Sequence, residues 1–144
     1  MGTQSMTEGE RQEFLAGVHV GVLAIERADG PPLAVPVWYG YRPGGVVEVL
    51  TSGRSLKGRL VAAAGRASLC AQQEELPYRF VTVEGPVEVE ELGEEARIQV
   101  EELAIRYLGE ELGRSYAAGG VADDEVVLRL TPERWLSVDY SKPT

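Results

Sequence analysis

A run of nine residues, 51–59, contains the residue types that bind a phosphate group. Thr51 and Ser52 carry hydroxyl groups, Ser55 stands where a helix would begin, and Lys57 falls in its first turn. The first turn of a helix has backbone N–H groups without intrahelical partners and lies at the positive end of the helix dipole, so it attracts anions. The run is therefore a candidate phosphate site, in which Ser55 caps the helix and Lys57 neutralises the anion.

Two arginines of the same run, Arg54 and Arg59, are further candidates for neutralising the anion. The spacing is equally compatible with an ordinary capped helix that exposes a solvated basic face. Both interpretations stay open at the level of spacing alone.

The basic residues of this region stand out because the protein as a whole is acidic, with 144 residues and a formal net charge of −9. No acidic residue occurs between Glu48 and Glu74, whereas four basic ones do, so this segment carries +4 and the rest of the chain −13. A local basic cluster in an acidic protein favours a small anionic ligand, and the acidic total disfavours nucleic acid and membrane surfaces as partners. Chance clustering, with salt bridges to the many glutamates, is the alternative explanation.

Other kinds of chemical site have little support. The single histidine, His19, falls in a predicted strand, and the single cysteine, Cys70, stands between apolar neighbours. A metal site would have to combine carboxylates with one thiol at poor spacing, and no serine or cysteine has a histidine nearby in sequence. We therefore predict no metal site and assign no catalytic residue.

The composition predicts a globular protein, since 44% of the residues are hydrophobic and 26% are charged. No apolar run approaches the roughly 20 residues of a membrane-spanning helix, and residues 1–13 lack the pattern of a signal peptide. A single cysteine fits a reducing compartment. We expect one domain over residues 1–144, located in the cytoplasm.

Hydrophobic periodicity predicts the elements that position the candidate site. The predicted helices cover residues 7–16, 55–64, 94–108 and 110–117. The predicted strands cover residues 18–26, 33–41, 46–51, 67–73, 78–90, 125–131 and 134–140. Because several strands are joined by tight turns, the order favours an α+β, mainly β fold, an antiparallel barrel with peripheral helices.

The sequence resembles the pyridoxamine 5′-phosphate oxidase-like split β-barrel family, whose members bind FMN or the deazaflavin coenzyme F-420. The resemblance extends over residues 13–140 and is carried by an ordered set of segments: VHVGVLA at 18–24, PVWY at 36–39, LT and SLK within 50–57, ASL at 67–69 and YRFVTVEG at 78–85. It implies a split β-barrel that binds a small-molecule cofactor and substrate, and a homodimer with the cofactor at the subunit interface.

The resemblance also implies roles for individual residues. The flat ring of the cofactor is expected along the second strand, at Val35, Pro36, Val37 and Trp38. The phosphate is expected at Thr51, Ser55 and Lys57. Residues 78–81, with Phe80 as the site residue among them, are expected to contribute from the partner subunit. Family members often have a basic residue between that serine and lysine, where this chain has Leu56, so Arg54 or Arg59 would have to compensate. A buried core position is the alternative for Trp38.

The function implied is that of a flavin- or deazaflavin-dependent oxidoreductase that transfers a hydride to a small substrate, and the alternative is a non-catalytic cofactor carrier or sensor. The true oxidase ends in an extension whose arginines hold pyridoxal phosphate, and no such motif follows Tyr140, so we do not expect vitamin B6 oxidation. The choice of cofactor stays open: Arg59 and Arg66 suit a long polyanionic tail, or are ordinary surface residues.

Overall fold

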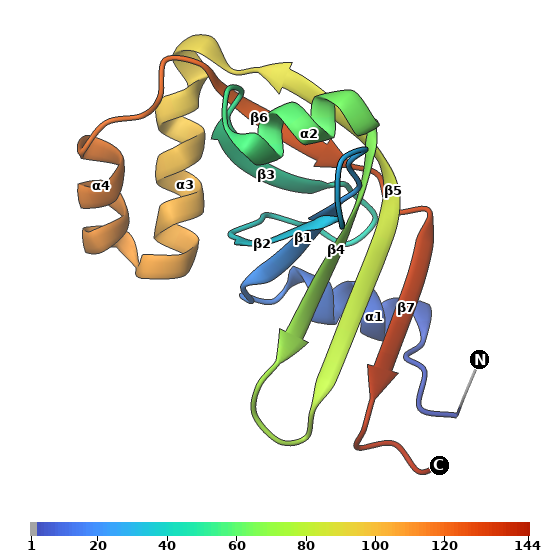
Figure 1. Ribbon diagram of the computed structural model, residues 1–144. Helices are drawn as coiled ribbons and strands as arrows, with labels where there is room; N and C mark the ends of the chain where they lie inside the picture. The colour runs from blue at the N-terminus through green and yellow to red at the C-terminus, as the bar shows by residue number, and fades with distance from the viewer. Residues whose placement is uncertain (1–2) are drawn as a thin grey trace.

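The computed structural model describes residues 3–144, in which four α-helices surround one curled sheet of seven strands (Figure 1). The strands are β1 (Gly21–Ile25), β2 (Leu33–Val37), β3 (Val47–Ser52), β4 (Arg66–Gln73), β5 (Arg79–Glu91), β6 (Glu125–Leu130) and β7 (Arg134–Asp139). The helices are α1 (Glu8–Ala16), α2 (Leu56–Ala64), α3 (Ala96–Leu108) and α4 (Glu110–Ala118), with a short 3₁₀ turn, η1 (Gly93–Glu95), before α3.

All strand pairs are antiparallel, in the order β2-β1-β4-β5-β6-β3, and β7 also pairs with β5. The long strand β5 joins the two halves of the sheet: residues 79–84 pair with both β4 and β7, and residues 87–91 pair with β6. At the change of partner, a Cβ on Gly85 would collide with the carbonyl oxygen of Thr131, so only glycine allows this approach. The predicted antiparallel split barrel is confirmed.

The core fills the inside of this curl. Strand residues alternate between buried and exposed, so that one face of each strand packs inward. The largest fully buried side chains are Tyr39, Leu15, Ile25, Leu69, Val47, Val61, Val81, Val83 and Val127. The buried hydroxyl group of Tyr39 has a hydrogen-bond partner, because it donates to the carbonyl oxygen of Leu15 at 2.7 Å.

Two helix starts follow the local sequence. Thr7 and Glu10 form the expected capping box at the start of α1, with hydrogen bonds of 3.2 and 2.8 Å between each side chain and the other residue's N–H. Ser55 caps α2, where its hydroxyl accepts a hydrogen bond from the N–H of Gly58 at 3.1 Å. The helix ends at Gly65, whose φ of 70° is a left-handed conformation that suits glycine.

Two strands are shorter than the periodicity predicts. β1 begins at Gly21 and not at residue 18, and β2 ends at Val37 and not at residue 41. The hydroxyl of Tyr107 in α3 lies 2.7 Å from the carbonyl oxygen of His19 and accepts the N–H of Tyr39 at 3.0 Å. In a longer hairpin, these backbone groups of His19 and Tyr39 would form hydrogen bonds between the strands. Here they form hydrogen bonds with the side chain of Tyr107 instead.

No helix among residues 3–144 has the length and apolar character needed to span a membrane.

Candidate functional site

A cavity of about 360 Å³ lies between the start of α2, the ends of β2 and β3, and the α3–α4 pair. Its walls are mainly apolar and aromatic, with Pro36 and Trp38 on one side and Val100 on another. The charged residues that line it are Lys57 and Glu125. Ligand sites are typically apolar clefts of this size that contain a few polar groups, so this is the candidate site.

A wider hollow of about 960 Å³ lies along β4 and β5, but its cations are already paired. Arg66 contacts Glu26 at 2.6 Å, and Arg134 contacts Glu84 at 3.9 Å. The hollow therefore offers little uncompensated charge to an anionic ligand.

The aromatic part of the cavity wall consists of Trp38, which follows β2, and Tyr116 of α4. Trp38 stacks on Tyr107 of α3, with ring centroids 5.1 Å apart and 8° between the planes. The ring centroid of Tyr116 in α4 lies 5.4 Å from that of Trp38. The two helices lie side by side next to the end of β2 (Figure 1) and are joined by Gly109 alone, whose φ is 86°. Of the predicted ring contacts, Pro36, Val37 and Trp38 line the cavity, whereas Val35 packs against the hydrophobic core.

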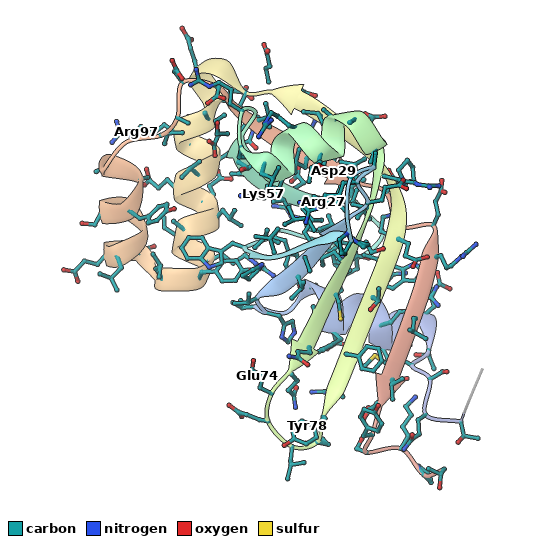
Figure 2. All side chains as sticks on the ribbon, in the orientation of Figure 1. Arg27, Asp29, Lys57, Glu74, Tyr78 and Arg97 are labelled. Atoms are coloured by element: carbon teal, nitrogen blue, oxygen red, sulfur yellow. The ribbon has the colours of Figure 1, made fainter. Side chains whose placement is uncertain are left out.

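Of the three residues predicted for the phosphate, Lys57 lines the same cavity, whereas Thr51 and Ser55 do not. Lys57 lies at the end of α2 nearest α3 (Figure 2) and lines the cavity, and no acidic side chain of residues 3–144 forms a salt bridge with it. Thr51 is buried, with its hydroxyl oxygen 3.0 Å from that of the capping residue Ser55. The backbone at Ser52 packs closely against the first turn of α2, since a Cβ on Gly58 would lie 2.7 Å from the carbonyl oxygen of Ser52.

Two further predicted residues, Ser52 and Arg54, are bound by an acidic pair that precedes β6. The Ser52 hydroxyl lies 2.7 and 2.8 Å from the carboxylate oxygens of Asp124, which also accepts Arg54 N–H and Nε at 2.9 and 3.0 Å. Arg54 Nη2 contacts Asp123 at 3.0 Å. These hydrogen bonds, that of Ser52 above all, lower the pKa of Asp124. Neither Ser52 nor Arg54 lines the cavity.

The remaining predicted residues lie apart from the cavity. Arg59 is exposed, and its Nε donates to the carbonyl of Arg54 at 3.3 Å. Phe80 is half-buried on β5, where Gln72 and Val138 are its partners in the neighbouring strands.

Four apolar residues that line the cavity were not predicted from the sequence: Val20, Leu50, Val100 and Leu103. Three polar or aromatic residues were not predicted either: Tyr116 and Glu125 line the cavity, and Tyr107 stacks on Trp38. Glu125 begins β6 and lines the cavity together with Lys57. Burial, and then the charge of Asp124, raise the pKa of Glu125, while Lys57 acts in the opposite direction. All three approach the cavity from elements far along the chain, and no local motif marks them.

Within residues 3–144, no three histidine, cysteine, aspartate or glutamate side chains lie together as metal ligands would. The cavity combines an aromatic wall, formed by Trp38 and Tyr116, with the amine of Lys57 at the start of a helix. This combination suits a ligand with a planar ring and an anionic tail.

Known proteins share this architecture. The chain is similar to the crystal structure of a conserved hypothetical protein, Rv2991, from Mycobacterium tuberculosis, with 24% identity over 100% of this chain and 93% of that one and a TM-score of 0.79. It is also similar to an F420 reductase, with 21% identity over 87% and 94% of the two chains and a TM-score of 0.69. An FAD-binding protein from Mesorhizobium loti has 21% identity over 92% and 94%, and a TM-score of 0.67. At these identities, the likeness shows the fold.

No curated protein matches the chain. The family model described as pyridoxamine 5′-phosphate oxidase matches residues 7–139, nearly the whole sequence. The resemblance found in the sequence is thereby confirmed, and the chain belongs to the pyridoxamine 5′-phosphate oxidase family of split β-barrel proteins.

Proposed function

We propose that this protein binds a flavin-type cofactor in the cavity between β2, α2 and the α3–α4 pair. The observation that carries the proposal is that Trp38 and Lys57, predicted separately for the ring and the phosphate, line one cavity. In this arrangement the flat ring lies along Pro36 and Trp38, where apolar and aromatic surface is available. The phosphate lies at Lys57 and the first turn of α2, with Thr51 and Ser55 beside it.

The activity that we infer is that of an oxidoreductase acting on a small substrate. When bound, a flavin or deazaflavin supplies the hydride chemistry, and the protein supplies position and electrostatics. The aromatic walls orient the ring, and Lys57 holds the tail. Likeness to proteins described as an F420 reductase and as FAD-binding supports this class of activity. A non-catalytic carrier or sensor is the second candidate, because Lys57 is assigned to the phosphate, which leaves Glu125 and Tyr116 as the other titratable residues among those that line the cavity.

We also propose that the protein works as a homodimer. A mainly apolar row crosses the outer face of five paired strands, and its members are Pro36, Val22, Cys70, Thr82 and Leu136. Val22 and Leu136 are 41% and 47% exposed. A continuous row of this kind fits a second copy of the same face across a two-fold axis. The row begins at Pro36, which also lines the cavity, so the second subunit would lie against the ring end of the site.

The test is a titration of the purified protein with FMN, with riboflavin and with the deazaflavin coenzyme, followed by cofactor fluorescence. We expect saturable binding of a phosphate-bearing cofactor at micromolar concentration or below. The bound cofactor is then reduced and mixed with electron acceptors. An oxidoreductase accelerates reoxidation relative to free cofactor, whereas a carrier does not. Absence of binding to all three compounds contradicts the proposed function itself.

A further inference from the structure

The phosphate end of the cavity has little net positive charge, although it lies in the basic segment of the chain. Arg54 is held by the two acids that precede β6, at 3.0 Å from each carboxylate. The Asp124 side chain is only 25% exposed and takes four contacts from Ser52 and Arg54. Arg54, although 76% exposed, is therefore already paired with two carboxylates. Lys57 is then the cation that lines the cavity.

Lys57 itself shares the cavity with a carboxylate, that of Glu125. The other titratable groups around Glu125 are Asp124, its neighbour in sequence, and Tyr116 from α4. β2, β3 and α3 present apolar side chains to the cavity, and so does Trp38, which follows β2. A phosphate placed at Lys57 therefore meets one amine and one carboxylate in a cleft whose other walls are largely apolar.

The charge of the incoming phosphate decides how well it fits this environment. A phosphomonoester carries about −1.5 to −2 at pH 7 because its second pKa is about 6. A phosphodiester carries a single negative charge. One lysine and the start of α2 can balance a single charge, whereas the second charge of a monoester is unbalanced and is repelled by Glu125.

Resting on the proposed cofactor site, we propose that the site selects a phosphodiester-linked cofactor over a phosphomonoester, and that Glu125 is the residue that determines this specificity. The class of ligand is a planar ring with a polyol chain that ends in a phosphate esterified on both sides.

Three ligands with the same ring test the inference: riboflavin, FMN, and the methyl ester of FMN, which is a diester. Their affinities for the full-length protein, for Glu125→Gln and for Lys57→Ala are measured at pH 8 by flavin fluorescence. We expect the wild type to bind the diester about three- to tenfold more tightly than FMN. Glu125→Gln, which keeps the size of the side chain, should remove most of this gap by improving FMN binding, and riboflavin binding should not change. At pH 6 the phosphate of FMN gains a proton, so the wild type should bind the diester and FMN with more similar affinities.

The outcomes separate this inference from the proposed function. A wild type that prefers FMN at pH 8, or a gap that is unchanged in Glu125→Gln, overturns the role of Glu125. If the wild type and Lys57→Ala bind all three ligands with the same affinity, the phosphate site itself is wrong. A preserved melting temperature in both variants ensures that the affinities report on the site and not on folding.

Discussion

The indole ring of Trp38 lies parallel to the phenol ring of Tyr107, with 5.1 Å between the centroids and 8° between the planes. The same tyrosine hydroxyl contacts the backbone of His19 and Tyr39. One residue of α3 therefore sets the orientation of Trp38, the start of β1 and the end of β2. The cavity wall and the barrel edge are joined through this single side chain.

Tyr107→Phe should destabilise the protein while it preserves the stacking. The N–H of Tyr39 would lose its partner at 3.0 Å, and an unsatisfied buried donor costs about 1–3 kcal/mol. The free energy of unfolding, measured by urea denaturation, reports this loss. Tyr140→Phe is the matched control, because Tyr140 is 55% exposed and should change stability little. Equal effects of the two substitutions would contradict the bridging role of Tyr107.

Trp38→Phe should abolish most of the fluorescence quenching that accompanies cofactor binding. The protein has two tryptophans, and the other, Trp135, does not line the cavity. Its ring centroid lies 4.7 Å from the guanidinium carbon of Arg11 and 6.3 Å from the ring centroid of Tyr41. Trp135→Phe should therefore retain the quenching. If the quenching disappears in Trp135→Phe and persists in Trp38→Phe, the ring binds elsewhere.

Lys57→Ala should weaken binding of phosphate-bearing cofactors by about 1.5–3 kcal/mol, the range for a hydrogen bond to a charged group. Riboflavin, which has no phosphate, should lose much less affinity. The variant should unfold no more easily than the wild type, since a positive charge in the first turn of a helix opposes the dipole. Arg59→Ala removes a nearby exposed charge and is the control. A similar loss of FMN affinity in both variants would indicate a diffuse electrostatic effect.

Gly113→Ala should separate α4 from α3, because an added Cβ would lie 2.6 Å from the backbone of Ile105. Overpacking of this kind costs about 1–3 kcal/mol and should move Tyr116 away from the cavity. Gly9→Ala in α1 is the control, since nothing lies within 4 Å of its added Cβ. That substitution should stabilise the protein by about 0.5–1 kcal/mol. Thermal or urea denaturation of both variants is the measurement, and destabilisation by Gly9→Ala alone would refute the packing argument.

Val22→Glu and Leu136→Glu should each convert the proposed dimer to a monomer, because each substitution buries a new charge in the proposed interface on both subunits. Light scattering at micromolar concentration measures the mass. Leu76→Glu introduces the same charge at a residue that is 77% exposed in the β4–β5 loop, and should leave the mass unchanged. A wild-type protein that is monomeric throughout would rule out the proposed interface.

Local patterns in the sequence were enough to predict the elements and part of the site. The Thr7 capping box, the Ser55 cap and the alternation along the strands depend on neighbours within a few residues, and those interactions form wherever the segment is placed. The split barrel and the family follow from an ordered set of short segments with the right spacing. Pro36, Trp38 and Lys57 were predicted separately, and the structure places them along one cavity.

The pairing of the charged side chains and the positions where β1 and β2 end depend on the tertiary structure. Asp124 binds Ser52 and Arg54 across 70 or more residues of sequence, and Tyr107 reaches Tyr39 across 68. With 23 acidic residues in the chain, nothing local indicates which of them will approach a given arginine. Side-chain pairing over such separations depends on how the sheet curls and where α3 and β6 are placed, and so it is set only when the whole chain has folded.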